Sequence, residues 1–338
     1  MTIRQRLSGA KEKAYRMKKT PLPLSLRNVR TYSLRRRKSL VHIEDFSRPF
    51  RPGGSLTEFL RSLPDFLAAK DFRRVVEKIA RARRRSKPVI LGMGAHPLKV
   101  GLSPLIVHWL EQGVLSAVAM NGAGIIHDFE VAFHGQTSED VASEIGRGAF
   151  GMAEETGRFI NQAIHEGVAN GLGIGEALGR YLSDLNPAFG KYSLLLQAYL
   201  RNIPVTVHVT IGADIIHNHP SVSPAAIGEG TYRDFRILAS LVAGLNEGGV
   251  YLNCGSAVNL PEVFLKCVTL VRNSGLTLQN FTTANLDFIQ HYRPTENVLK
   301  RPVKNGGRGI AITGHHEITI PLLAAWLVEL SPDTRNDS

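Results

Sequence analysis

Small residues gather in six short segments, each of which follows an apolar run, and several of the segments also contain histidine or aspartate. The segments are residues 94–96, 121–128, 212–219, 254–256, 283–285 and 314–316. Small residues let the backbone approach a ligand closely, and their N–H groups can hold a phosphate. Histidine and aspartate side chains can transfer protons or bind a metal ion. Together the segments predict a ligand crevice.

The histidines of these segments allow more than one chemistry. They are His96, His127, His217, His219, His315 and His316, accompanied by Asp128 and Asp214. A metal site is one hypothesis, although the spacing of these histidines and aspartates matches no standard zinc signature and there is no HExxH motif. Cys254 could act as a nucleophile, but a small buried cysteine at a strand end is favoured. Pro97 stands where a GxGxxG turn needs its third glycine, and no P-loop motif occurs.

Apolar runs alternate with helical patterns along most of the chain. We expect strands at 89–93, 114–120, 203–211, 248–254, 277–284 and 309–313. We expect helices over 56–79 with a break near Pro64, from Ser103, through much of 137–201, over 261–272 and from about Glu317. This alternation predicts a Rossmann-like α/β fold, a mostly parallel sheet covered by helices on both faces. Ligands bind such sheets outside the carboxyl ends of the strands.

Charge is concentrated at the N-terminus of this 338-residue chain. Residues 1–40 hold 13 of the 41 Lys/Arg residues and one of the 29 acidic residues, which accounts for the net charge of +12. We predict a flexible basic arm over 1–45, a single α/β catalytic domain over 46–332 and a tail over 333–338. If a nucleic acid or an acidic partner binds, we expect the contact at the arm.

Two cysteines and the apolar pattern bear on the compartment. No run of 18 apolar residues occurs, so we expect no membrane span. With only Cys254 and Cys267, no disulfide framework is expected, and a reducing cytoplasm is the predicted location.

Taken in order, several segments resemble deoxyhypusine synthase, an NAD-dependent aminobutyl transferase. The resemblance covers about residues 88–330 and is one of order and spacing. The segments are "VILGMGAHPLKVGLSPLIVHWLEQGVLSAVAMNGAGIIHDF", "IPVTVHVTIGADIIH", "VYLNCGSAVNLPEVFLKCVTLVRNSG", "FTTAN", "RPTENVLKRP" and "HHEITIPLLAAWLVE". It implies NAD as cofactor, a polyamine as small-molecule amine substrate, and a homotetramer with active sites between subunits.

The resemblance also assigns site residues. The positions that match its cofactor contacts are Gly94, Ala95, His96, Gly122, Ala123, Gly124, Thr283, Ala284 and His315. The positions expected to bind substrate are His127, Asp128, Asp214 and Gly255. His127 stands where the family has a polyamine-binding glutamate, and Asp214 matches an aspartate that holds the polyamine.

The amine half of the resemblance is less complete than the cofactor half. Pro302 falls at the position of the family's reactive lysine, with Lys300 and Lys304 two residues to either side. We expect Lys300 to form the imine, with Lys304 as the second candidate and Glu296 one helical turn away. The predicted function is transfer of an alkyl-amine group to an amine acceptor through a lysine imine. A metal-dependent hydrolase and a non-catalytic nucleotide-binding protein are the alternatives.

Overall fold

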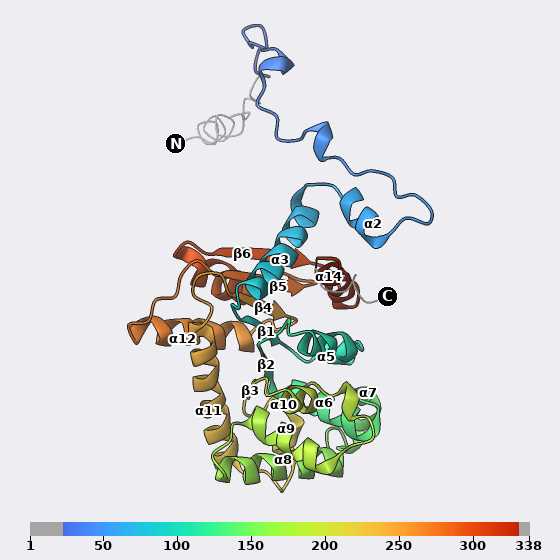
Figure 1. Ribbon diagram of the computed structural model, residues 1–338, viewed down its shortest axis with the longest axis vertical. Helices are drawn as coiled ribbons and strands as arrows, with labels where there is room; N and C mark the ends of the chain where they lie inside the picture. The colour runs from blue at the N-terminus through green and yellow to red at the C-terminus, as the bar shows by residue number, and fades with distance from the viewer. Residues whose placement is uncertain (1–22, 331–338) are drawn as a thin grey trace, which may run out of the picture. The chain divides into compact units, whose positions relative to one another are not determined.

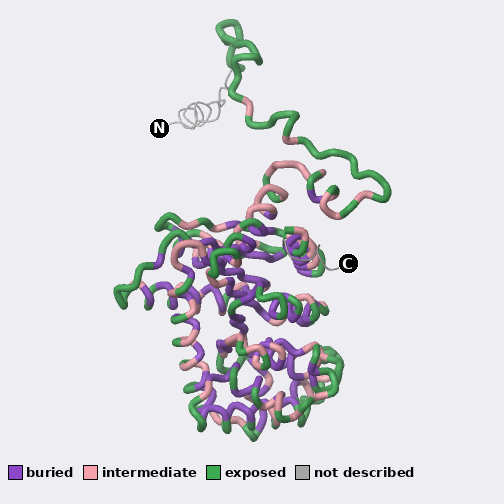
Figure 2. Tube along the Cα trace, viewed as in Figure 1, coloured by how far each residue is buried: buried purple, intermediate pink, exposed green. Residues whose placement is uncertain are grey.

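The computed structural model describes residues 23–330, and the chain divides into two units, residues 1–44 and 45–338. Residues 23–44 hold the 3₁₀ helix Leu34–Arg36 and are almost entirely exposed (Figure 2). The predicted tail over 333–338 and most of the basic arm lie outside the described residues. Among the described helices, none is long and apolar enough to cross a membrane.

Six parallel strands form the central sheet of the second unit (Figure 1). They are β1 (Val89–Met93), β2 (Ala117–Asn121), β3 (Val205–His208), β4 (Val250–Cys254), β5 (Thr282–Asp287) and β6 (Arg308–Thr313). Their order is β3-β2-β1-β4-β5-β6, and every pairing is parallel. The predicted α/β fold is confirmed. The order reverses between β1 and β4, and a crevice between their loops is where sheets of this kind bind ligands.

Helices cover both faces of the sheet. They are α2 (Leu56–Ser62), α3 (Leu67–Arg84), α4 (His96–Lys99), α5 (Ser103–Glu111), α6 (Gly122–His134), α7 (Val141–Glu144), α8 (Glu154–Ala169), α9 (Ile174–Leu185), α10 (Leu194–Leu200), α11 (Pro224–Ala243), α12 (Asn259–Asn273), α13 (Tyr292–Pro294) and α14 (His316–Glu329). The predicted break near Pro64 separates α2 from α3. Helix α5 begins at Ser103, as predicted, and Leu102 is the residue at its N-cap position.

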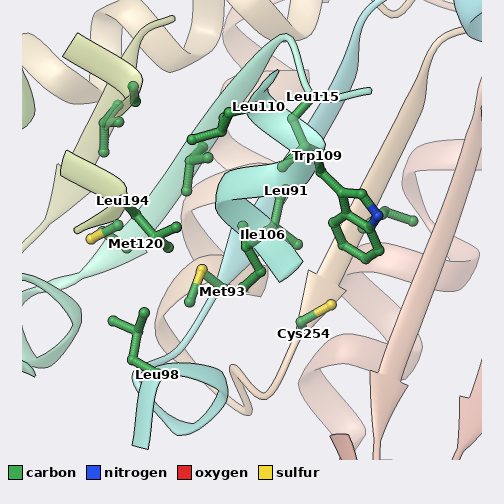
Figure 3. Packing of buried hydrophobic residues seen from close by; sticks show 14 of the residues in the cluster. Leu91, Met93, Leu98, Ile106, Trp109, Leu110, Leu115, Met120, Leu194 and Cys254 are labelled. Atoms are coloured by element: carbon green, nitrogen blue, oxygen red, sulfur yellow. The ribbon is translucent and has the colours of Figure 1, made fainter. Parts of the chain in front are cut away.

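Two hydrophobic clusters lie on opposite faces of the sheet, as strand alternation requires. Leu91 and Met93 of β1 point into the larger cluster with α3, α5 and α14, and Figure 3 shows them in this cluster with Ile106 and Trp109 of α5. Ile90 points the other way, into the cluster that α11 and α12 cover. Strands buried on both faces explain the near-continuous apolar runs in the sequence.

The fifth strand differs most from its prediction. We expected it to end at Ala284, but β5 runs to Asp287 and begins only at Thr282. The polar residues in its second half are buried and bonded. Asn253 Nδ2 donates to Asn285 Oδ1 at 2.7 Å, and Asn285 Nδ2 donates to Gln290 Oε1 at 2.8 Å. Such pairing removes the cost of burying amides in a central strand.

The edge strand β3 is completed by side chains of α11 instead of a further strand. Asp234 Oδ2 accepts from Val207 N at 2.8 Å and from Gly175 N, at the start of α9, at 3.1 Å. Thr231 Oγ1 donates to Val207 O at 2.9 Å and accepts from Val209 N at 3.0 Å. Asp234 Oδ1 is buried without a hydrogen-bond partner among the described residues. Burial raises the pKa of Asp234 to about 7, against the backbone N–H groups that lower it.

Asp234 should make folding less favourable as the pH rises. Its folded-state pKa of about 7 lies above the unfolded value of 3.8, so its contribution is complete below the unfolded value and is lost as the pH passes through the folded one. Relative to Asp234→Asn, the wild type should lose roughly 2–3 kcal/mol of unfolding free energy between pH 5 and pH 8. Urea unfolding of both proteins at the two pH values measures this. An unfolding free energy of the wild type that stays constant or rises between pH 5 and pH 8, relative to that of Asp234→Asn, contradicts the prediction.

Candidate functional site

The loops that follow β1 and β4 touch at the point where the strand order reverses. Gly94 N donates to Cys254 O at 3.0 Å, and a Cβ on Gly94 would lie 2.2 Å from Gly255 O. Gly255 itself has φ +63°, a conformation that favours glycine. These glycines are therefore required by the contact between the two loops. Their close approach brings the carboxyl ends of β1 and β4 together at the position of the predicted crevice.

Three imidazoles and a phenylalanine lie close to one another at the predicted crevice. His316 begins α14, and its Nε2 bonds Leu286 O at 2.9 Å while its buried Nδ1 has no partner among the described residues. The His96 ring lies 5.3 Å from that of His316 and 6.3 Å from that of Phe288. His315 stacks on Phe288 at 5.7 Å. Burial, followed by His316, lowers the pKa of His96, so this ring favours its neutral form.

The N-terminus of α6 already faces a carboxylate. Asn121 Oδ1 caps the helix by accepting from Gly124 N at 3.0 Å. A Cβ on Gly122 would lie 1.9 Å from Asp214 Oδ2, which is buried and has no hydrogen-bond partner within residues 23–330. Burial raises the pKa of Asp214 to about 6, and a hydrogen bond from the Thr210 backbone opposes the shift. The space we expected beside Gly122 for a phosphate is thus filled by Asp214.

Asp128 of α6 points into the protein interior. Asp128 is buried and accepts from Ser193 Oγ at 2.5 Å, from Leu194 N at 2.6 Å and from Leu195 N at 3.2 Å. It therefore caps α10 together with Ser193 and is not in position to bind a substrate, which corrects the prediction. Burial raises the pKa of Asp128 to about 6, while these three hydrogen bonds lower it.

His127 belongs to a hydrogen-bonded relay at the carboxyl edge. Its Nδ1 lies 2.6 Å from Thr137 Oγ1, and Thr137 Oγ1 donates to Glu130 Oε2 at 2.6 Å. Thr156 Oγ1 donates to Glu130 Oε1 at 3.2 Å. Burial and then the charge of Lys99 lower the pKa of His127 to about 4. The imidazole is neutral at neutral pH.

Two predicted cofactor residues lie away from the crevice. Thr283 and Ala284 are in the middle of β5 and completely buried, because the strand continues beyond them. Thr283 Oγ1 donates to Val298 O at 2.7 Å, which holds the segment after α13 against the sheet. The prediction that these two residues follow the strand end is wrong. Phe288 is the residue that does.

The predicted catalytic lysines lie at the opposite edge of the sheet. Lys300 ends the π-helix Thr295–Lys300 and pairs with Glu296 at 2.7 Å. The segment after it runs beside the first residues of β5 and β6, since Asn280 N donates to Asn305 O at 3.1 Å and Gly307 N to Val303 O at 2.9 Å. Lys304 lies in this segment. Within one chain, the lysines and the glycine loops do not share a pocket.

The remaining loop histidines and Cys254 serve local structure. His217 Nδ1 accepts from Gly212 N at 3.2 Å, and His219 Nε2 bonds Gly151 O at 2.9 Å. Within residues 23–330, no three His, Cys, Asp or Glu side chains form a group that could hold a metal ion. Burial, with Asp287, raises the pKa of the Cys254 thiol to about 12, as expected for a buried strand-end cysteine.

The structure thus joins part of the predicted site and adds residues to it. Gly94, Ala95, His96, Gly255 and His315 meet at the crevice. Gly122, Ala123 and Gly124 form the first turn of α6, the helix that follows the neighbouring strand β2. Phe288, Thr137, Glu130 and Lys99 were missed. Phe288 was missed because the predicted end of β5 was wrong by three residues. No sequence pattern marks Thr137 and Glu130 as hydrogen-bond partners of His127.

No family model and no curated protein sequence matches the chain. Solved structures match at low identity. The "conserved putative LOR/SDH protein" of Methanococcus maripaludis S2 is 15% identical, with TM-score 0.51, over 84% of this chain and 75% of that one. AgrE, in a complex with ornithine and NAD⁺, is 15% identical, with TM-score 0.50, over 78% of this chain and 34% of that one. The structure of "a putative deoxyhypusine synthase" from Entamoeba histolytica is 11% identical, with TM-score 0.49, over 83% of this chain and 95% of that one.

These similarities show the fold alone. The α/β architecture is shared with the LOR/SDH protein and with part of AgrE. The chain spans about a third of the length of the AgrE and ArgZ structures that it matches.

Gly122 should tolerate no side chain while Asp214 is present. Gly122→Ala should lower the unfolding free energy by about 1–3 kcal/mol, because its Cβ overlaps the Asp214 carboxylate. Gly146→Ala is the matched control, since nothing lies within 4 Å of a Cβ there. Adding Asp214→Ala to Gly122→Ala should recover most of the loss. Urea unfolding of the four proteins tests this, and a double variant no more stable than Gly122→Ala argues against the overlap.

Proposed function

We propose that the protein is an NAD-dependent enzyme that acts on a small molecule at the carboxyl edge of its sheet. The observation that carries the proposal is the contact of Gly94 and Gly255 at the point of strand reversal, with His96, His316 and Phe288 around it. Parallel sheets bind dinucleotides at this position. A solved structure of the same fold, AgrE, contains NAD⁺ and ornithine, which supports the proposal by likeness of fold.

The residues at the crevice fit a dinucleotide. Phe288 is 47% exposed and, with His315 stacked on it, offers a flat face to an adenine or nicotinamide ring. The first turn of α14 has no side-chain cap, and its free N–H groups suit a pyrophosphate oxygen. The N-terminus of α6 fits less well, since Asp214 already faces it. When bound, the dinucleotide would accept or donate a hydride.

Alkyl-amine transfer through a lysine imine is the specific reaction that the resemblance implies. Lys300, with Lys304 second, would have to come from a neighbouring copy of the chain, because both lie at the amino edge. The Lys300 side chain is 61% exposed in the single chain, so only an interface could bury it as an imine-forming nucleophile requires. A homotetramer with sites between subunits remains part of this proposal.

Dinucleotide binding is the first property to measure. Calorimetry should detect NADH binding to the full chain, and Phe288→Ala should weaken it at least tenfold, about 1.4 kcal/mol, through loss of the stacking face. Tyr232→Ala removes an aromatic ring that is exposed on α11 and should leave the affinity unchanged. Absence of NADH binding to the wild type at millimolar concentration overturns the proposal.

The imine has its own test. Borohydride added with NAD⁺ and spermidine should trap a mass adduct on the peptide that contains Lys300. Lys300→Ala should abolish the adduct and leave NADH binding unchanged, because the proposed dinucleotide contacts come from the loops after β1 and β4 and from Phe288, and not from the lysine. Lys266→Ala, which also breaks a lysine–glutamate pair, is the control. If NADH binds and no adduct forms, the lysine mechanism fails while the dinucleotide proposal stands.

A further inference from the structure

We propose that residues 23–44 bind the surface of an anionic phospholipid bilayer, with their basic side chains at the headgroups and their aliphatic side chains in the outer part of the hydrocarbon layer. This inference does not rest on the proposed dinucleotide site, because the segment belongs to the unit that precedes the α/β domain in the sequence. Three features of the segment carry the proposal: exposed apolar side chains, an excess of cations and an irregular backbone.

The large apolar side chains of the segment are all exposed (Figure 2). Eight of its 22 residues are of this kind, and each side chain is more than half exposed: Leu24, Leu26, Val29, Tyr32, Leu34, Leu40, Val41 and Ile43. A segment that serves only as a solvated linker is poor in such residues, because their contact with water is unfavourable. Their number therefore indicates that a partner surface covers them.

The cations of the segment are not neutralised within it. Six of its residues are Arg or Lys, and Glu44 is the one acidic residue in its sequence. Four of the six are consecutive, from Arg35 to Lys38, and all four are exposed. The sequence before residue 23 adds seven basic residues and one acidic residue. The partner surface must therefore be anionic.

A second copy of the chain does not supply the missing negative charge. After residue 40 the sequence has 28 basic and 28 acidic residues, so this part of the chain is neutral overall. Two copies would also bring together two basic segments, which repel each other. An anionic bilayer offers many negative charges at once, and each Lys or Arg near such a surface raises the binding constant about fivefold.

The spacing of the apolar residues fits a fluid surface better than a protein groove. Successive members are 2, 3, 3, 2, 6, 1 and 2 residues apart, which is neither the period of a strand nor that of a helix. The described backbone forms one short 3₁₀ helix, Leu34–Arg36, and local bonds such as Val29 N to Leu26 O at 3.1 Å. A protein groove needs apolar anchors at a fixed spacing, whereas a bilayer accepts them anywhere along a segment.

RNA is the competing polyanion. Segments that bind RNA use cations for the phosphates and aromatic rings for the bases. Tyr32 is the one Phe, Tyr or Trp residue of 23–44, and the other seven large apolar residues are aliphatic. These aliphatic side chains favour the bilayer. They also separate the two partners by experiment, because binding to a bilayer requires them and binding to RNA does not.

The first test uses the full-length chain and vesicles of phosphatidylcholine that contain about one-third phosphatidylglycerol. Co-sedimentation at about 0.1 M salt should show binding to these vesicles, and binding to pure phosphatidylcholine should be at least tenfold weaker. Replacing Arg35, Arg36, Arg37 and Lys38 by Gln should weaken binding at least a hundredfold, as four factors of about five predict. The matched control removes four exposed arginines of the α/β domain and should stay within about twofold of the wild type: Arg81, Arg84, Arg85 and Arg236, each to Gln.

The second test removes apolar side chains and keeps every charge. Leu34→Ser, Leu40→Ser and Val41→Ser, combined in one variant, should weaken vesicle binding at least tenfold and leave any binding to polyuridylic acid unchanged. Its control combines Val141→Ser, Leu200→Ser and Leu276→Ser, at exposed positions of the α/β domain, and should bind like the wild type.

A tryptophan in the segment reports its insertion directly. Emission from Leu34→Trp should move to shorter wavelengths when anionic vesicles are added. The wild type should show no such change, because its two tryptophans, Trp109 and Trp326, are buried.

Three results overturn the proposal. They are no binding of the wild type to anionic vesicles, vesicle binding that the three serines of the segment leave unchanged, and binding to polyuridylic acid in preference to vesicles. The last result assigns the segment to a nucleic acid. NADH binding, measured on the same variants, should equal that of the wild type, so this proposal and the dinucleotide proposal succeed or fail separately.

Discussion

The contact between Gly94 and Gly255 sets the geometry of the whole carboxyl edge. Parallel pairing of β1 and β4 brings their last residues side by side, and the absence of a side chain at Gly94 lets the two loops close. Gly255 in turn rests on the His316 ring, which bonds the backbone of Leu286 near the end of β5. Loops that follow β1, β4, β5 and β6 are thereby coupled through backbone and imidazole contacts. A change at any of them moves the others, because packed interiors have little free volume.

Strand positions could be predicted from apolar runs because the sheet is buried on both faces. The first strand matches its prediction at both ends. The fifth does not, because Asn285 and Asp287 carry polar side chains that sequence patterns assign to loops. Their burial is compensated by Asn253, 32 residues earlier, and by Gln290 and the Phe288 backbone. Compensation across strands has no local signal, and this one error displaced part of the predicted cofactor site.

The opposite roles of His127 and Asp128 could have been found in the sequence. Ile125, Phe129 and Ala132 form the buried stripe of α6, with helical spacing. Asp128 falls within that stripe, three residues after Ile125 and four before Ala132, and so had to be buried and bonded. His127 falls beside it. What the sequence could not reveal is the partner: Ser193 lies 65 residues away, on a segment that packs against α6 only in the fold.

Asp234 and Thr231 have a consequence for how this molecule meets others. The outer side of an edge strand normally presents unpaired amide and carbonyl groups, which can recruit a strand from another molecule. Along β3, the Val207 amide and carbonyl and the following Val209 amide are already bonded to side chains of α11. A foreign strand would first have to strip these bonds and leave a buried carboxylate unsatisfied. Helix α11 thus protects the edge strand β3 from pairing with a strand of another molecule and from amyloid-like growth.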